Sequence, residues 1–426
     1  MKDLVFFTDR YPYNNSEAFI ENEIDIMASH FNRVFILPCG LMVDTKTCRK
    51  VPKNVRIISP PVQDDIWASR PSRTKKVIWG ISHLFPWFVL CLFTKQFYKE
   101  LGNINSKIGI SPKGIIKVFR VLGPAIRNRN YYRQKLKKEN IQDAIVYSYW
   151  LETSVLFAGK ILKDTKIEKK ICRTHRWDLY AEESSIGYLP FQKQVIEYLD
   201  KVYVISDDGL KYLETIYPEY SHKFSVSRLG TKDFGINPVR SNLNEFVIVS
   251  CSFVHKVKRV NLIVEALARI ERFEVAVKWI HFGGGQDLNT MKQLAYDKLK
   301  GKVDFEFTGQ VTNAFILDYY KNHHIDLFVN VSASEGIPVS IMEATSFSIP
   351  VIATDVGGTR EIVLNNKNGI LLNKDFETDE LARIISSLIV DADKLNSLRN
   401  NSRTIWEVTY FSDSNYRGFY KELLGV

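Results

Sequence analysis

The sequence predicts an α/β protein made of two doubly wound, parallel-sheet domains, and three observations support this prediction. The chain has 426 residues, which is more than one ordinary domain. Its 45% hydrophobic and 25% charged residues are typical of a globular protein and exclude a disulfide scaffold, a coiled coil and a disordered tail. Short apolar runs alternate with amphipathic stretches, the pattern of parallel strands covered by helices on both faces.

Two sets of strand candidates follow one another along the chain. Strands that are buried on both faces of a parallel sheet read as short, continuous apolar runs. The first set comprises residues 4–7, 34–37, 144–149, 170–174, 202–206 and 224–229. The second set comprises residues 246–252, 275–282, 303–308, 327–331, 350–353 and 369–372. Each set is large enough for a sheet of its own.

A polar stretch that contains glycine and proline, residues 230–244, separates the two sets. We therefore expect an N-terminal domain over residues 1–228, a linker over 229–245 and a C-terminal domain over 246–405. Ligands of doubly wound sheets bind at the carboxyl ends of the strands. Two such domains facing each other would place a substrate cleft between them.

The positive charge is concentrated in one segment. Net charge is +10, and residues 66–138 contain 16 Lys or Arg but one acid, Glu100. Within them, residues 77–93 carry no charge, yet they are short for a membrane span, which needs about 20 apolar residues, and Pro86 interrupts them. Basic flanks and aromatic side chains favour docking on an anionic membrane surface. A buried core helix and a true span are the alternatives.

Other features of the sequence exclude some partners and compartments. No helix-turn-helix, zinc-finger or RNP-type motif accompanies the basic residues, so nucleic acid is not expected as a partner. The N-terminal apolar run is too short for a signal peptide. The odd number of scattered cysteines predicts thiols in a reducing compartment, which indicates the cytosol. These are Cys39, Cys48, Cys91, Cys172 and Cys251.

The stretch over residues 332–344 predicts an anion site. A strand ends just before it, Gly336 allows a tight turn, and Pro338 suits the first position of a helix. The free N–H groups of that helix would then bind a diphosphate. Glu335 and Glu343 flank the site, and carboxylates hold hydroxyl groups rather than phosphates. A diphosphate with a hydroxyl-bearing ring on either side is a nucleotide sugar.

Glu335 and Glu343 also form an E-x7-E pattern. The segments EGIPVSIMEA (335–344) and PVIATDVGGTREIV (350–363) closely resemble glycosyltransferase family 4, which contains retaining enzymes of the GT-B architecture. Over nearly the whole chain, further segments resemble the bacterial surface-polysaccharide members of that family in the same order. These are YP at 11–12 with SEAFIENEI at 16–24, RTHRWDLY at 173–180, VKRV at 257–260 with IVEAL at 263–267, and FGGG at 282–285.

The resemblance implies a role for each matching residue. Three would be catalytic: Glu335 would hold hydroxyls of the donor sugar, His175 would lie over that sugar, and Lys258 would neutralise the leaving diphosphate. Glu343 would hold the ribose. The other donor-binding residues would be Gly336, Ile337, Pro338, Val339 and Ser340 along the sugar and diphosphate, Gly284 in the glycine-rich loop, Thr308 and Gly309 beside the base, and Arg259. The acceptor-binding residues would be Asn14, Asn15, Ser16 and Glu17.

The resemblance also implies a reaction and a place. The N-terminal domain would bind the acceptor and the membrane, and residues 406–426 would form a helix that crosses back to it. A hexose would pass from a UDP- or GDP-linked donor to a hydroxyl of a lipid-linked glycan, with retention of configuration. No DxD motif lies nearby, so neither a metal nor another cofactor is expected. The enzyme would be cytoplasmic and peripheral on the inner face of the cytoplasmic membrane. The oligomeric state is unknown.

Two rival functions stay open, a non-catalytic nucleotide-sugar-binding protein and a GT-B sugar-nucleotide epimerase. Some residues also have an ordinary structural alternative. Asp178 is interpreted as a helix cap. His175 also fits a structural histidine, Lys258 a surface lysine, and residues 283–285 a plain strand-to-helix turn.

The sequence departs from the family pattern at two places near the expected site. Residues 252–255 occupy the stretch where many relatives have an arginine, so Lys256 or Arg259 would have to compensate in binding the diphosphate. Ser348 stands where a glycine is usual, which indicates a local adjustment of the backbone.

Overall fold

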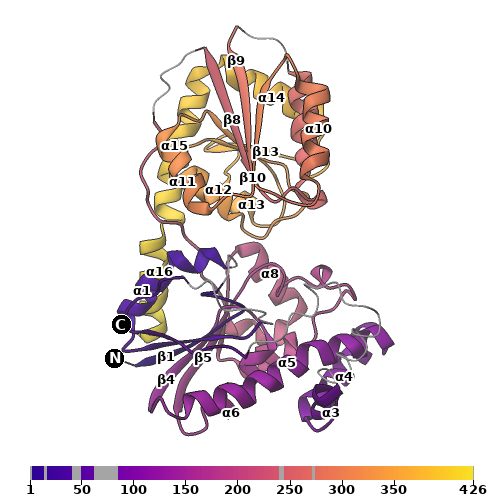
Figure 1. The fold of residues 1–426 in the computed structure, drawn as a ribbon, viewed down its shortest axis with the longest axis vertical. Helices are drawn as coiled ribbons and strands as arrows, with labels where there is room; N and C mark the ends of the chain where they lie inside the picture. Colours follow the sequence, from indigo (N-terminus) through magenta and orange to yellow (C-terminus); the bar gives the residue numbers. More distant parts are fainter. Residues whose placement is uncertain are drawn as a thin grey trace. The chain divides into compact units, whose positions relative to one another are not determined.

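The computed structural model describes residues 2–13, 17–40, 49–61, 85–238, 244–270 and 274–425. The chain divides into two compact units. The first contains Met1–Ile205, Gly209–Ser227 and Tyr420–Val426, and the second contains Ser206–Asp208 and Arg228–Phe419. Each unit has one sheet of parallel strands with helices packed around it (Figure 1). The fold is therefore the α/β architecture with two doubly wound domains that the sequence predicts.

The first sheet has the strand order β3-β2-β1-β4-β5-β6-β7. Its strands are β1 (Asp3–Thr8), β2 (Val34–Pro38), β3 (Val55–Ile57), β4 (Asp143–Ser148), β5 (Lys166–Thr174), β6 (Lys201–Val204) and β7 (Phe224–Val226). The described helices of this part of the chain are α1 (Ile24–His30), α3 (Phe85–Leu92), α4 (Lys95–Ile108), α5 (Pro112–Leu136), α6 (Ala158–Ile161), α7 (Gln192–Tyr198) and α8 (Asp207–Ile216). The order reverses between β1 and β4, and such a switch point is where doubly wound sheets bind ligands.

The second sheet repeats this arrangement with the order β10-β9-β8-β11-β12-β13. Its strands are β8 (Glu245–Cys251), β9 (Ala276–Phe282), β10 (Asp304–Gly309), β11 (Leu327–Asn330), β12 (Val351–Thr354) and β13 (Gly369–Leu372). The helices are α9 (Val260–Arg269), α10 (Leu288–Leu299), α11 (Asn313–Asn322), α12 (Val339–Ser346), α13 (Thr359–Ile362), α14 (Thr378–Val390), α15 (Ala392–Thr409) and α16 (Ser412–Leu424). The switch point here lies between β8 and β11.

All twelve predicted strands are present, with shifts of at most four residues at their ends. The sequence prediction missed β3, which pairs with β2 through Val34↔Val55 and Phe35↔Arg56. It has three residues and lies at the edge of the sheet, so no long apolar run marks it.

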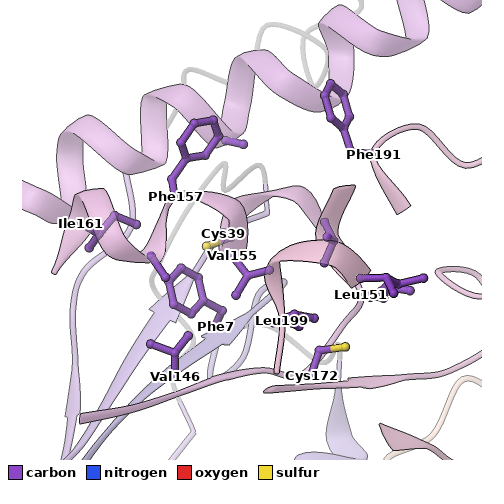
Figure 2. Packing of buried hydrophobic residues seen from close by; sticks show 14 of the residues in the cluster. Phe7, Cys39, Val146, Leu151, Val155, Phe157, Ile161, Cys172, Phe191 and Leu199 are labelled. Carbon is purple, nitrogen blue, oxygen red and sulfur yellow. The ribbon is translucent and has the colours of Figure 1, made fainter. Parts of the chain in front are cut away.

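The core of the first unit packs helices against the sheet (Figure 2). Phe7 and Val146 come from β1 and β4, and Phe157 and Ile161 come from the segment after β4. Cys172 of β5 is fully buried among them, and burial raises the pKa of its thiol well above the ordinary range. The four described cysteines are free, and a buried thiol of this kind acts as a small apolar side chain.

The C-terminal segment differs from the prediction of one helix over 406–426. Trp406 belongs to the end of α15, and α16 begins after a break at Tyr410 and Phe411. The last residues, from Tyr420 onwards, group with the first unit. There the Tyr420 hydroxyl donates to Oε1 of Glu23 at 2.6 Å, and Arg173 Nη1 donates to Oε2 at 2.6 Å.

Among the described residues, no helix is both long and apolar enough to cross a membrane. Residues 77–84 of the uncharged segment lie outside the described part of the chain. Its end forms α3, which packs on α5, with the rings of Phe88 and Phe119 stacked at 3.8 Å. Cys91 of α3 is buried, but Phe88 and Phe93 remain 42% and 83% exposed. The helix therefore covers the core on one side and exposes apolar side chains on the other.

Candidate active site

Two loops meet at the switch point of the second sheet. The loop after β11 carries Glu335, which is 8% exposed, and the short 3-10 turn after β8 carries Lys258. Lys258 Nζ lies 2.6 Å from Oε1 of Glu335, and Asn330 Nδ2 lies 3.4 Å from the same oxygen. The structure thus brings together two of the three side chains predicted to be catalytic.

Backbone hydrogen bonds hold these two loops in register. The N–H of Ala333 donates to the carbonyl of Val257 at 2.7 Å. Arg259, predicted to bind the donor, donates hydrogen bonds to three backbone carbonyls. Its guanidinium donates to Val331 at 2.7 Å, Ser332 at 3.2 Å and Lys374 at 2.7 Å. Arg259 therefore helps to hold the loop that presents Glu335, and a donor-binding role for it stays a prediction.

Two glycines make room for this loop. Gly357 has φ +51°, and a Cβ atom there would lie 2.0 Å from the carbonyl oxygen of Glu335. The N–H of Gly358 donates to the carbonyl of Gly336 at 2.8 Å. The VGGT segment after β12 is therefore a backbone support for the loop that holds Glu335 and Gly336.

Helix α12 begins one residue later than predicted. Pro338 is the N-cap, with extended backbone angles, and Val339 is the first helical residue. Ile341 makes the first N–H bond back to the Pro338 carbonyl, at 3.0 Å. The N–H groups of Val339 and Ser340 precede that bond and lie at the positive end of the helix. Ile337 is buried beneath them.

Ser348 follows the end of α12 and takes the place of a usual glycine. Its φ is +64°, a left-handed conformation that non-glycine residues rarely adopt. The sequence departure is thus a local backbone matter, as predicted.

Glu343 lies within the same helix and is 9% exposed. Asn313 Nδ2, at the start of α11, donates to its Oε1 at 2.8 Å. Burial raises the pKa of Glu343 to about 7, although the hydrogen bond from Asn313 opposes this. Sequence reasoning missed Asn313, although its place just beyond the end of β10, after Gly309, could have suggested it.

The predicted base and glycine-loop residues lie at the neighbouring strand ends. The N–H of Gly283 donates to the Gly309 carbonyl at 3.1 Å, and the Thr308 hydroxyl donates to the His281 carbonyl at 3.3 Å. A Cβ atom on Gly284 would lie 3.1 Å from Cβ of Gln310. These contacts serve close packing of the ends of β9 and β10, and a donor role for Gly284, Thr308 and Gly309 stays a prediction.

His175 follows β5 in the first unit and is 8% exposed. Its ring lies 4.7 Å from Tyr149 and 4.4 Å from Trp150, between centroids. Within the described residues, neither ring nitrogen has a hydrogen-bond partner. Burial lowers the pKa of His175 well below its ordinary value, and the nearby charge of Arg173 adds to this effect. The imidazole is therefore neutral, with one ring nitrogen able to donate a hydrogen bond and the other able to accept one.

Two acidic residues near His175 have structural tasks. Asp178 is not a helix cap as predicted, because its carboxylate accepts from the backbone N–H groups of His175, at 2.8 Å, and Leu151, at 2.7 Å. Glu17, predicted to bind the acceptor, accepts hydrogen bonds from three backbone N–H groups and from Trp150 Nε1. Asn14, Asn15 and Ser16 lie outside the described residues.

In the described ranges, no group of three or more His, Cys, Asp or Glu side chains is placed to hold a metal ion. The expectation of a metal-independent reaction stays a prediction.

Comparison with known proteins relates the second half of the chain to a family model. Residues 232–405 match the family model described as Glycosyl transferases group 1. The O-antigen biosynthesis glycosyltransferase WbnH of Escherichia coli is 25% identical over 169 residues, which are 39% of this chain and 43% of that protein. A GDP-mannose-dependent alpha-(1-6)-phosphatidylinositol monomannoside mannosyltransferase of Mycobacterium tuberculosis is 31% identical over 142 residues, 31% of this chain and 35% of that protein. The matches thus span less than half of these relatives.

Solved structures resemble the fold over the whole chain. The lipopolysaccharide outer core galactosyltransferase WaaB has a TM-score of 0.64 at 16% identity, covering 100% of this chain and 99% of its own. Sucrose-phosphate synthase from Thermosynechococcus elongatus has a TM-score of 0.68 at 15% identity, and HepE of Anabaena, solved with UDP-glucose, has 0.61 at 14%. Both cover 100% of each chain. The architecture is that of the GT-B glycosyltransferases.

Proposed function

We propose that this protein, whose residues 232–405 form a glycosyl transferases group 1 domain, is a retaining hexosyltransferase that uses a nucleotide-sugar donor. The observation that carries the proposal is the Lys258–Glu335 ion pair at the start of α12, a helix that also buries Glu343. The turn after β8, the loop after β11 and α12 thereby present a cation, two carboxylates and backbone N–H groups close together.

Each part suits one part of the donor. The first N–H groups of α12 and the ammonium of Lys258 take the diphosphate, whose negative charge grows as it leaves. Glu335 accepts hydrogen bonds from the sugar hydroxyls, and Glu343 accepts them from the ribose. HepE, which shares the fold, has been solved with UDP-glucose, and the similar mannosyltransferase of Mycobacterium tuberculosis is GDP-mannose-dependent. These two relatives support a uridine or guanosine diphosphate sugar as the donor.

The expected reaction needs no carboxylate nucleophile. The bond between C1 of the sugar and the diphosphate oxygen breaks, and the acceptor oxygen bonds to C1 on the same face. The acceptor proton passes to the departing diphosphate. Lys258 compensates the charge of that group, so we propose a metal-independent reaction with no other cofactor.

We further propose a lipid-linked glycan of a bacterial surface polysaccharide as the acceptor, and peripheral binding at the inner face of the cytoplasmic membrane. Glu100, the single acid between residues 85 and 138, is fully buried and accepts from the Tyr188 hydroxyl at 2.8 Å and from Gln194 Nε2 at 2.8 Å. The exposed charges of α4 and α5 are therefore all basic, and α3 carries none. Apolar side chains that are 36% to 83% exposed accompany them: Phe88, Leu90, Leu92, Phe93, Tyr98, Ile108, Ile110 and Ile116.

An assay of nucleotide release tests the proposal. The purified full chain is incubated with a panel of UDP- and GDP-sugars, with and without a bacterial lipid extract that contains lipid-linked glycans. We expect the nucleotide to be released only when one particular donor and the lipid extract are both present. NMR should show that the transferred sugar has the same anomeric configuration in the product as in the donor. Conversion of the donor without any acceptor would indicate an epimerase. Binding without release would indicate a non-catalytic protein.

A further inference from the structure

The loops that follow β1, β4 and β5 meet at the carboxyl edge of the first sheet. These strands are neighbours, with Phe7 paired to Ser148 and Ser148 paired to Cys172 at their ends. The carboxyl ends of parallel strands at a switch point are the usual place for a ligand. The side chains that these loops present therefore define a candidate site on this unit.

One carboxylate ties the β1 loop to the β4 loop. Glu17 accepts from the N–H groups of Asp9 at 3.1 Å, Arg10 at 2.6 Å and Tyr11 at 2.6 Å, and from the indole of Trp150 at 2.6 Å. Asp178 ties the β4 loop to the β5 loop in the same way through two backbone N–H groups. Both carboxylates are thus used to hold the edge together.

Three other side chains of this edge, Asp9, Glu152 and His175, do not tie the loops together. Glu152 Oε1 and both ring nitrogens of His175 lack a hydrogen-bond partner among the described residues. Asp9 Oδ2 lies 3.4 Å from Nε of Arg10. Burial, together with the neighbouring carboxylates, raises the pKa of Asp9 to about 6 and that of Glu152 well above its ordinary value. A raised pKa favours the protonated carboxyl, which can donate a hydrogen bond as well as accept one.

An aromatic surface adjoins these groups. The Trp177 side chain is 46% exposed, and its ring lies 4.8 Å from Trp150, which in turn lies 4.4 Å from His175. A half-exposed indole offers a flat apolar face. A pyranose ring needs this combination, because one of its faces is lined by C–H groups and its rim carries hydroxyls.

We propose that Asp9, Glu152 and Trp177, with His175 at their border, form a subsite for a neutral pyranose ring of the acceptor glycan. The inference rests on the proposed function and names the part of the acceptor that this unit binds. A ring that carries a carboxylate or phosphate would be repelled by Asp9, which is ionised above its pKa of about 6. The acceptor residue bound here is therefore an uncharged hexose or N-acetylhexosamine.

Saturation-transfer NMR with simple glycosides tests the subsite. The probes are the methyl pyranosides of glucose, galactose, mannose and N-acetylglucosamine, with methyl glucuronide as the anionic counterpart. We expect the full chain to transfer saturation to at least one neutral glycoside, and Trp177→Ala and Glu152→Gln each to weaken its binding by about fivefold. Trp177→Phe should retain part of it. Tyr296→Ala, which removes an exposed ring of the second unit, should change nothing.

The proposal would be overturned if the wild-type protein bound none of the neutral glycosides or preferred the glucuronide. It would also be overturned if Trp177→Ala and Glu152→Gln both bound the neutral glycoside as tightly as the wild type does. UDP and GDP binding, measured on the same samples, checks that the variants are folded and separates the two proposals. If the wild-type protein bound neither UDP nor GDP, the proposed donor site would be contradicted. Binding of the glycosides tests the proposed sugar subsite alone.

Discussion

Glu343 is proposed to bind the ribose, and its buried carboxylate also lowers the stability of the fold when it is ionised. Its carboxyl has an ordinary pKa of 4.5, and burial raises the pKa to about 7 in the folded protein. The fold therefore loses stability as pH rises from 4.5 through 7, because the ionised group is buried. We expect Glu343→Gln to increase the free energy of unfolding by on the order of 2 kcal/mol near pH 8 and by little near pH 5. Urea unfolding at both pH values measures this, and an equal difference at the two would contradict it.

Glu335 and Lys258 should affect transfer rather than nucleotide binding. Glu335→Gln keeps the shape but removes the charge that faces the sugar, and Lys258→Gln removes the charge that compensates the leaving group. Each should lower kcat by on the order of 10² to 10³ while the affinity for the free nucleotide changes little in Glu335→Gln. Steady-state kinetics and calorimetry together check this. A Glu335→Gln enzyme that transfers normally would refute the assignment.

The contacts of two predicted binding residues, Arg259 and Glu17, could not be read from the sequence, and both cases have the same physical cause. Arg259 and Glu17 lie in motifs that resemble a family, but a motif does not reveal which backbone groups a side chain will find. Arg259 donates to three carbonyls and Glu17 accepts four hydrogen bonds, contacts set by tertiary packing. The sequence indicated Glu335 and Lys258 separately, through motifs that follow recognisable strands, and their contact across 77 positions is shown only by the structure.

At the scale of elements, α16 is fastened to the first sheet by a buried network. Glu23, Arg173 and Tyr420 are all 0% exposed. Glu23→Gln leaves Arg173 buried without its charged partner and should cost about 3–5 kcal/mol in unfolding free energy. Tyr420→Phe removes one hydrogen bond to Glu23 and should cost about 1–3 kcal/mol. Urea unfolding of the full chain measures both values.

Arg417→Ala is the matched control on the same helix. Arg417 forms an exposed pair with Asp413 at 2.8 Å, so its loss should cost no more than about 0.5 kcal/mol. A Tyr420→Phe variant as stable as this control would show that the network does not fasten α16. Sequence alone could place a helix here, but it could not predict that Tyr420 meets Glu23 across nearly the whole chain.

For the whole molecule, apolar periodicity predicted two sheets because buried parallel strands are marked in the sequence itself. β3 was missed since a three-residue edge strand carries little of that signal. The candidate sugar subsite was missed for another reason. Asp9, Glu152 and Trp177 come from three separate loops, and only the strand order β1-β4-β5 brings them to one edge.

Membrane binding is a prediction for the whole molecule, because it depends on the summed charge of α3 to α5. We expect the protein to sediment with phosphatidylglycerol vesicles more than with phosphatidylcholine vesicles, and salt to weaken this. Phe93→Asp should reduce sedimentation severalfold. Val408→Asp changes a side chain that is 81% exposed, against 83% for Phe93, and should have no effect. Equal behaviour of the two variants would contradict docking through α3.

Calorimetric titration of the full chain with UDP and GDP tests the proposed nucleotide-sugar donor site at the start of α12. We expect one nucleotide to bind without added metal and Glu343→Gln to weaken its binding by at least about tenfold, because the ribose loses a carboxylate partner. Binding of neither nucleotide to the wild type, or equal binding by the variant, would contradict it.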